Sequence, residues 1–591
     1  MFPFIPRDLL ILLKKLWSNF STQRRKQLLF LIIFTVFGAF IDLLTIGMIF
    51  PFLAILTTPE IVFDYPIIKD ILIFFNINDS SSLIFIITFL FIFFVFVSTI
   101  MRVAILYANT RLAYASGADL SIKVYENVLY QPYNFHISRN SSESISIILV
   151  KINNIINSVM LPIITAIGSF FVVISFCITI TLVNPLVSIS IFSCFLILYI
   201  IVSIISTKKL KYLGKVLSEQ QNKITKSLHE GFGAIKDILL NNLQPIYVNK
   251  HRLTDYKLRK AQGNNVIIAS TPRYIIESFG MISIAAVAYF LISLDFDSLF
   301  ILQTLGLLAV SAQRLLPLLQ QMYHTRTNIK AHKNNLKDVI SLLDHRIPKC
   351  YNIKSLSGLK FEKFIEFDNV CFNYDEHTEI LKSLSFKINK GSRVGLVGPT
   401  GSGKSTILDL LMGLLQPTDG HLFIDETKIN NTNSLEWQRK IAHVPQNIYL
   451  SDSSISENIA LGVEEKDINY DRIKLVSRAA SLYDFIVSLP NGFNTIVGER
   501  GTKLSGGQRQ RIAIARALYR DAEFLVFDEG TSSLDLETEK KVMESIENFN
   551  PLLTIVMVAH RLTTLKNCEK IIEIENGQIK AFLDYKTLNK N

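Results

Sequence analysis

The sequence predicts an integral membrane protein with two parts: a helical domain that crosses the bilayer six times, then an α/β domain of soluble character. Hydrophobic residues make up 49% of the 591 residues, and the mean hydropathy is +0.33. Soluble chains of this length rarely average above zero. Charge is nearly absent from several long stretches of the first half, while the chain after about residue 325 has the composition of a soluble protein.

Six stretches are long and apolar enough to cross a bilayer, whose core of roughly 30 Å needs about 20 apolar helical residues. They are residues 28–56, 83–107, 159–183, 185–205, 274–294 and 298–319. Before them, Lys14 and Lys15 interrupt the apolar run and no cleavage signal follows. We therefore expect residues 1–27 to form a cytoplasmic or interfacial amphipathic helix and not a signal peptide.

Basic residues are concentrated in alternate loops, and therefore on one side of these spans. Lys and Arg precede the first span and fill the long segments 108–158 and 206–273, while the loop after the first span is acidic. This bias places the N-terminus, both long segments and the C-terminal domain in the cytoplasm. Pro132 and the glycines near residue 232 predict short bends at Tyr130–His136 and Glu230–Asp237 within the long segments.

These boundaries predict four regions. They are the N-terminal helix 1–27, a transmembrane domain 28–321, a linker 322–359 and a nucleotide-binding domain 360–591. The net charge of +11 is explained by basic cytoplasmic loops, so we expect no nucleic-acid partner. The five cysteines show no CxxC spacing, which argues against a zinc site or a disulfide framework.

The first functional motif of the soluble domain is a phosphate-binding loop. An apolar strand at 392–397 leads into GPTGSGKST and then into an apolar helix, as the P-loop G-x-x-x-x-G-K-[ST] requires. The loop comprises Gly398, Pro399, Thr400, Gly401, Ser402, Gly403, Lys404, Ser405 and Thr406. Its glycines let backbone N–H groups turn toward phosphate oxygens. Lys404 is expected at the β- and γ-phosphates of ATP, and Ser405 at Mg²⁺.

A second apolar strand, FLVFDE at 524–529, ends in two acids. In P-loop enzymes the first acid binds Mg²⁺, which is the role expected for Asp528. Glu529 is then placed to polarise the attacking water as a general base. The alternative is that Glu529 only caps the following helix.

LSGGQRQRIAIARAL, residues 504–518, resembles the signature motif of ABC transporters. The resemblance implies that Ser505, Gly506, Gly507 and Gln508 meet ATP held by a partner domain. It further implies an adenine-stacking role for Tyr374, a Q-loop role for Gln446 at Mg²⁺ and the water, a D-loop role for Asp535, and a γ-phosphate switch role for His560. VGERG at 497–501 resembles the loop of exporter members that touches the transmembrane helices.

The resemblance covers nearly the whole chain, which is similar to a half-transporter of exporter type (type IV). One departure is Gly530, where the family usually has alanine after the catalytic glutamate. Because each ATP site of the family needs the P-loop of one domain and the signature of another, the resemblance implies a homodimer. A heterodimer is the alternative.

The cargo is predicted from charges near the cytoplasmic ends of the spans. Arg102, Arg273 and Arg314 are expected at a similar depth, and guanidinium groups suit a phosphate or pyrophosphate head group. Asp42 and Glu277 also lie in spans and are alternative partners of these arginines. The first span resembles that of bacterial flippases of lipid-linked oligosaccharides, which implies a bacterial inner membrane and an anionic, amphipathic cargo.

Two other functions remain open from the sequence. One is the export of peptides, drugs or other lipids, and the other is a non-transporting ATPase that gates a channel or regulates a partner. Glu529 and His560 favour turnover over gating. A soluble ABC protein of translation is excluded, because it would lack spans and would carry two ATPase cassettes.

Overall fold

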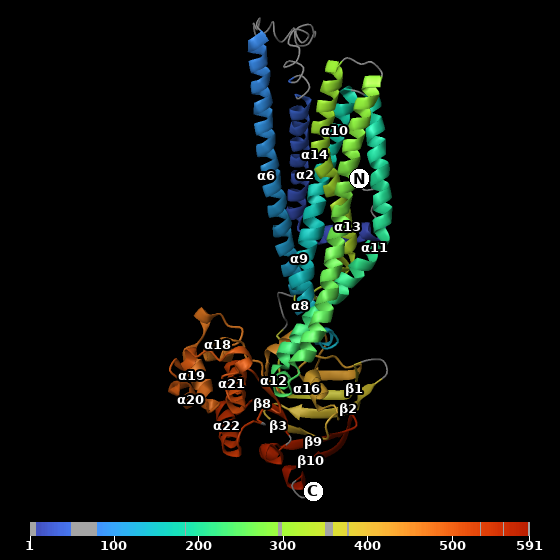
Figure 1. Ribbon diagram of the computed structural model, residues 1–591. Coiled ribbons are helices and arrows are strands. Elements are labelled where there is room, and N and C mark those ends of the chain that lie inside the picture. The colour runs from blue at the N-terminus through green and yellow to red at the C-terminus, as the bar shows by residue number, and fades with distance from the viewer. Residues whose placement is uncertain are drawn as a thin grey trace. The chain divides into compact units, whose positions relative to one another are not determined.

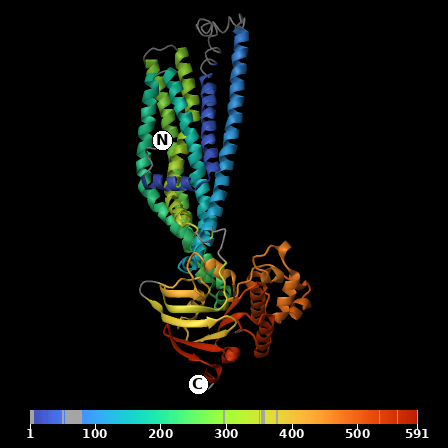
Figure 2. The same ribbon diagram turned by 180° about the vertical axis from the view of Figure 1, so that it is seen from behind.

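The computed structural model describes residues 7–48, 52, 80–183, 185–293, 298–348, 351, 358–374, 378–531, 533–559 and 561–588. The chain divides into two compact units. The first unit comprises residues 1–131 and 139–346, and the second comprises residues 132–138 and 347–591. Figures 1 and 2 show the helices of the first unit and the sheets of the second from opposite sides.

Long helices running side by side form the first unit (Figure 1). They are α2 (Thr22–Gly47), α6 (Ser80–Leu129), α10 (Leu161–Val183), α11 (Pro185–Gly233), α13 (Gln244–Ser293) and α14 (Ser298–Ala331). Four described stretches have the length and apolarity of a membrane span: Thr22–Thr45, Ile84–Leu129, Ser141–Ser175 and Gln244–Ser293. The expected spans at 185–205 and 298–319 lie within α11 and α14. Of the expected first span, residues 49–51 and 53–56 lie outside the described residues.

Both expected bends are confirmed as short helices. The helix α6 ends at Leu129, and α7 (Tyr133–Ile137) follows Pro132, whose ring cannot continue a helix. After α11 ends at Gly233, α12 (Ile235–Leu240) forms the second bend. Residues 132–138, with α7, belong to the second unit, whereas α12 belongs to the first. Between α7 and α10 the chain forms α8 (Ser141–Ser146), η1 (Ile147–Lys151), α9 (Ile152–Ile155) and η2 (Ile156–Met160), of which η1 and η2 are single π-helical turns.

The N-terminal helix α1 (Arg7–Asn19) packs against α15 (Lys333–Asp344) within the first unit. Lys15 binds Asp344 at 2.6 Å, and Lys333 binds Asp8 at 3.1 Å. The buried Leu9 lies on the packed side of α1. The structure thus shows that α1 packs against another helix of the same unit. Its position at a membrane surface stays a prediction.

Two sheets build the second unit. The strands β1 (Phe364–Asn373), β2 (Glu379–Asn389), β4 (Asp419–Ile424) and β5 (Thr427–Lys428) pair antiparallel in the order β2-β1-β4-β5. The other sheet has the order β10-β9-β3-β8-β7-β6, comprising β3 (Arg393–Val397), β6 (Ile441–Val444), β7 (Phe524–Asp528), β8 (Thr554–Val558), β9 (Lys570–Glu575) and β10 (Gln578–Leu583). All its pairs are parallel except the β9–β10 edge. Parallel pairing places the carboxyl ends of β3 and β7 at one edge, where the predicted motifs follow.

The helices of the second unit follow these strands. They are α16 (Lys404–Leu411), α17 (Ser434–Arg439), α18 (Ile455–Ile459), α19 (Tyr470–Ala479), α20 (Tyr483–Ser488), α21 (Gly506–Tyr519), α22 (Leu536–Phe549) and α23 (Tyr585–Leu588). One apolar core lies between the antiparallel sheet, α16 and β3, and includes Trp437. A second core lies under α18 to α22.

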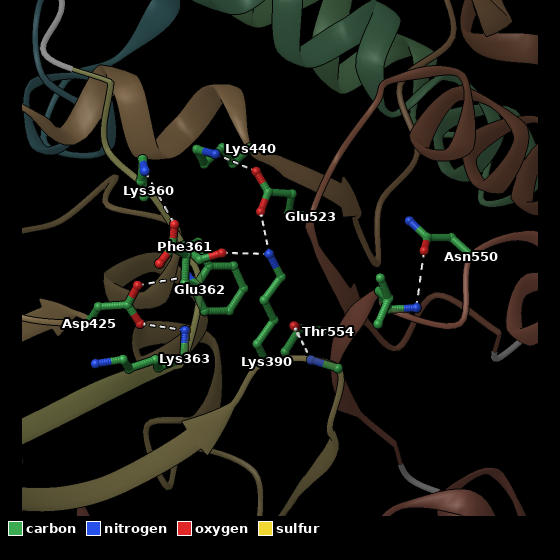
Figure 3. Close-up of polar contacts among 12 residues, drawn as sticks. Lys360, Phe361, Glu362, Lys363, Lys390, Asp425, Lys440, Glu523, Asn550 and Thr554 are labelled. Atoms are coloured by element: carbon green, nitrogen blue, oxygen red, sulfur yellow. Dashed lines mark hydrogen bonds and ion pairs between the residues drawn. The ribbon is translucent and has the colours of Figure 1, made fainter.

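A network of ion pairs ties the two sheets together (Figure 3). Lys390, which follows β2, and Lys440, which precedes β6, both bind the carboxylate of Glu523. Although burial alone would raise the pKa of Glu523, the hydrogen bonds from the two lysines hold it below its ordinary value. The carboxylate of Asp425 accepts hydrogen bonds from the backbone N–H groups of Glu362 and Lys363 at 2.7 and 2.8 Å. The segment before β1 is therefore fixed to the turn after β4.

Candidate functional site

The loop between β3 and α16 has the conformation that a phosphate group needs. Gly401 and Gly403 adopt φ of +82° and +102°, which aims successive N–H groups into the loop. A Cβ on Gly403 would meet Leu381 Cδ2 at 2.6 Å, so a side chain there would also force Leu381 to move. Pro399 accepts the hydrogen bond from Ser402 N–H at 3.2 Å that closes the turn.

Two side chains of this loop have polar atoms that a bound phosphate would satisfy. Lys404 Nζ donates to the carbonyl groups of Gly398 and Pro399, at 2.9 and 2.8 Å. Burial lowers the pKa of Lys404, and the carboxylates of Glu529 and Asp528 act against that effect. The hydroxyl of Ser402 is buried and has no hydrogen-bond partner among the described residues. The loop therefore fits the phosphates of a nucleotide.

The two acids at the end of β7 lie beside this loop. Burial raises the pKa of Asp528, and the negative charge of Glu529 adds to that effect. Glu529 has φ of +52°, a strained conformation for a residue that is not glycine. Its Oε2 accepts a hydrogen bond from Gln446 Nε2 at 2.7 Å. The structure thus brings Gln446, Asp528, Glu529 and Lys404 into one site.

Gly530 has a packing reason that the sequence did not show. A Cβ at this position would meet Val444 Cγ1 at 2.7 Å and Phe527 Cδ1 at 2.8 Å. Alanine would therefore require β6 or β7 to shift next to the acid that the site depends on. The departure at Gly530 fits the packing of this chain.

The predicted adenine side lies at the end of β1. The hydroxyl groups of Tyr374 and Thr406 are 3.4 Å apart, and the Tyr374 ring is 41% exposed and available for stacking. Tyr133 of α7 lies nearby. Burial raises the pKa of Tyr133, with Asp409 and Tyr374 contributing. The bend α7 is therefore close to the helix that follows the phosphate loop.

The signature segment begins the helix α21. Ser505 is its N-cap and accepts from Gln508 N–H at 3.2 Å, while Gln508 Oε1 accepts from Ser505 N–H at 2.8 Å. Among the described residues, no hydrogen bond or ion pair joins residues 505–508 to the phosphate loop 398–406. The two predicted halves of an ATP site are thus not joined within this chain.

Gln510 is a site residue that the sequence analysis missed. It is buried, its Nε2 donates to the carbonyl of Glu529 at 3.3 Å, and its Oε1 accepts from Ser533 N–H at 2.8 Å. It thereby connects the signature helix to the acid and to the D-loop. The sequence could have indicated this role through the position of Gln510. It lies two residues after Gln508 and therefore on the opposite side of α21.

Asp535 caps α22 by accepting a hydrogen bond from Thr538 N–H at 3.0 Å.

Asp409 is a second residue near the site that the sequence analysis missed. Burial and the charge of Asp528 raise its pKa to about 6. His560, the predicted switch residue, lies outside the described residues.

The three membrane arginines differ in their surroundings. Arg102 Nη2 binds Asp42 at 2.6 Å, and Arg273 lies 3.8 Å from Glu277 on the same helix. These pairs are the alternative that the sequence left open. The side chain of Arg314 lies outside the described residues. Arg102 lines a cavity between α2, α6, α10 and α14, and Arg273 is not among its lining residues. The structure therefore does not bring the three together, and their shared anion site stays a hypothesis.

Comparison with known proteins agrees with both units. Residues 28–313 match the family model of the ABC transporter transmembrane region, and residues 381–532 match that of the ABC transporter. Multidrug resistance protein pgp-1 of Caenorhabditis elegans is 43% identical over 229 residues, which are 38% of this chain and 17% of that protein. The ATP-dependent lipid A-core flippase of Wigglesworthia glossinidia brevipalpis is 30% identical over 387 residues, 65% of each chain.

This chain therefore spans less than two thirds of the length of each of these relatives. A solved structure of a bacterial Atm1-family ABC exporter with ATP bound superposes with a TM-score of 0.78 at 20% identity and covers 96% of both chains. The superposition shows the fold of an exporter half-transporter. The two family matches, taken with the site, show that the chain belongs to the ABC transporters and carries their transmembrane region and ATPase domain on one polypeptide.

Proposed function

We propose that the protein hydrolyses ATP and uses it to flip or export an amphipathic substrate from the cytoplasmic side of a bacterial inner membrane. The proposed substrate is a lipid-linked oligosaccharide or a related polyprenyl-pyrophosphate glycan. The observation that carries the substrate class is the cavity of the first unit, whose lining combines apolar side chains with Arg102. Charged groups within membrane spans are costly and are usually retained for function.

The residues of the second unit support hydrolysis. Glu529 is held by the hydrogen bond from Gln446 and by the backbone contact with Gln510, so its carboxylate is oriented to accept a proton from an attacking water. Lys404 and the glycine loop hold the phosphates in place. Ser405, Gln446 and Asp528 would hold Mg²⁺, which supplies charge neutralisation at the phosphates when bound.

We propose a homodimer as the working assembly, embedded in the lipid bilayer. In the part of the chain that the structure describes, no hydrogen bond joins the signature Ser505–Gln508 to the phosphate loop. The α21 N-terminus that carries the signature is nevertheless a suitable anion site. Two copies supply both halves twice. Isolation only with a different ABC chain would favour the heterodimer.

The relatives support a lipid substrate more than a drug. The alignment with the lipid A-core flippase covers 387 residues and so extends beyond the second unit into the membrane helices. The alignment with the multidrug protein covers only 229 residues. An ATPase domain alone does not distinguish cargoes.

The test is reconstitution of the full chain in liposomes with a panel of lipid-linked sugars, plain phospholipids, peptides and drugs. We expect lipid-linked sugars to stimulate ATP hydrolysis most and to cross the bilayer only with ATP. The Glu529→Gln protein is the control for movement without hydrolysis. Stimulation and movement by drugs or peptides alone would overturn the proposed cargo and keep the exporter. ATP hydrolysis that moves nothing would favour a gating or regulatory role.

A further inference from the structure

The cavity of the first unit has a volume of about 520 Å³ and combines apolar walls with polar side chains. Its polar members include Asp42, Arg102, Asn109, Gln313 and Gln321. They come from α2, α6 and α14. A cavity of this size accommodates a head group and not a whole lipid-linked glycan.

Asp42 and Arg102 form an asymmetric ion pair at this cavity. The Asp42 carboxylate accepts from Arg102 Nη2 at 2.6 Å and Nε at 3.0 Å, and from the Ser98 hydroxyl at 2.5 Å. The Asp42 side chain is only 9% exposed, whereas that of Arg102 is 41% exposed. Both residues line the cavity, and the guanidinium is the more exposed member of the pair. Among the described residues, Arg102 Nη1 makes no hydrogen bond.

Close packing of α2 and α6 holds this pair in place. A Cβ on Gly38, one turn before Asp42, would meet Ile105 Cδ1 at 2.4 Å. One turn after Asp42, Thr45 Oγ1 donates to the Ile41 carbonyl of its own helix at 2.9 Å and lies 3.3 Å from the Phe94 carbonyl of α6. The same face of α2 thus carries the close approach, the carboxylate and the hydroxyl that contacts α6. Paired charges removed from water repay their desolvation poorly, so packing alone does not explain the pair.

A second observation points to a ligand at this cavity. Asn109 lies two helical turns after Arg102 on α6 and is buried, and its Oδ1 has no hydrogen-bond partner among the described residues. A buried amide oxygen without a donor costs free energy. Two turns of helix span about 10 Å, so a head group bound at Arg102 would bring a donor to this oxygen only by extending along α6.

We propose that Asp42 is a displaceable counter-ion and that a phosphate or pyrophosphate group of the cargo takes its place on Arg102. The inference rests on the proposed function, and it names the residue that selects the cargo. A planar guanidinium binds phosphate through two parallel hydrogen bonds.

Because the cargo must displace Asp42, the site selects cargo by its charge. A neutral amphiphile cannot break the ion pair. A carboxylate has the same charge as Asp42 and gains little by the exchange. A phosphate monoester has a charge of about −1.5 to −2 at neutral pH and gains more. The site therefore prefers phosphorylated lipids over fatty acids and neutral lipids.

The test measures binding of four probes to the full chain in detergent by equilibrium dialysis. They are farnesyl phosphate, farnesoic acid, farnesol and inorganic phosphate, which separate the phosphate from the tail and a lipid source from a free anion. For Asp42→Asn we expect farnesyl phosphate to bind roughly tenfold more tightly, because the competing charge is gone. Farnesol should change less than about twofold, because it does not compete for the guanidinium.

Arg102→Gln should abolish the preference for farnesyl phosphate over farnesol. Ser98→Ala, which loosens Asp42 without removing it, should tighten farnesyl phosphate by about threefold and covers the case that Asp42→Asn fails to fold. The matched control is Asp119→Asn. It breaks the Arg24–Asp119 pair, 2.8 Å long, between the same two helices and outside the cavity, and binding should not change.

Unchanged or weaker binding of farnesyl phosphate to both Asp42→Asn and Ser98→Ala would overturn the inference, because Asp42 would then be a bystander or a direct ligand. Tighter binding of inorganic phosphate alone would assign the site to a free anion and overturn the lipid cargo. These measurements need no ATP. Tighter binding without ATP-driven transport would therefore refute the proposed function alone, and transport without tighter binding would refute this inference alone.

Discussion

The nucleotide site of the second unit is built largely from backbone groups, whereas the cavity of the first unit is built from side chains of four helices. In the second unit, positive-φ glycines and strand ends set the geometry, and few other residues fit those positions. In the first unit, Asp42, Arg102 and Asn109 sit on helices that would form equally well without them. This difference is consistent with one type of ATPase domain being used with many cargoes. The constrained nucleotide site carries out the shared chemistry, and the less constrained membrane helices can vary with the cargo.

The largest expected effect lies in the constrained part. Glu529→Gln removes the acceptor for the proton of the attacking water but keeps the hydrogen-bonding shape. We expect ATP hydrolysis to fall by roughly 10²–10⁴-fold with nucleotide binding retained. The control is Glu537→Gln on the exposed face of α22, which removes the ion pair with Lys541. Hydrolysis by Glu529→Gln at the parental rate would show that the Glu529 carboxylate is dispensable. It would contradict the view that the second unit tolerates few changes.

The next effect concerns stability of the first unit. Lys151 is fully buried and binds Asp338 of α15 at 2.5 Å. Asp338→Asn leaves this ammonium without a counter-ion, so the free energy of unfolding should fall by about 3 kcal/mol. Thermal unfolding of the full chain measures the shift. The exposed Lys15–Asp344 pair offers the control, since Asp344→Asn should cost less than about 1 kcal/mol. Equal shifts in the two variants would contradict the role of burial.

Gly530→Ala tests how little freedom the backbone-built site has. The new Cβ has no space between Val444 and Phe527, so Glu529 should move and hydrolysis should fall on the order of tenfold. Gly358→Ala is the control, because no atom of the described residues lies within 4 Å of its Cβ position. The measurement is the ATPase rate at saturating ATP. An unchanged rate for Gly530→Ala would show that β6 adapts.

The smallest expected effect is a pH dependence at Asp409. Its pKa is raised to about 6, so the folded state binds the proton more tightly than the unfolded state. This stabilisation is complete below the ordinary pKa of about 3.9 and is lost as the pH rises through about 6. Relative to Asp409→Asn, which stays neutral, the parental protein should lose stability across that window. Unfolding midpoints of both proteins between about pH 4.5 and 7.5 check the trend, and a constant difference would contradict it.

Much of the second unit could be predicted from the sequence. The strands before the two motifs, the glycine loop, the acids at the strand end and the capped signature helix all depend on interactions within a few residues. Gln446 and Glu529 were assigned to one site by resemblance, and the structure joins them at 2.7 Å. Gln510 and Asp409 were missed because their importance comes from burial and from neighbours distant in sequence.

The sequence by itself determined that the chain crosses a membrane, where its helices bend and which residues form the phosphate loop, because apolar length, breaker residues and local spacing act over short stretches. Packing was needed to show that Arg102 pairs with Asp42 at a cavity, that Arg273 pairs with Glu277 on its own helix, and that a Cβ on Gly530 would collide with Val444 and Phe527. Asp42 and Arg102 are 60 residues apart in the chain. Their contact depends on how closely two helices pack, which no local pattern specifies.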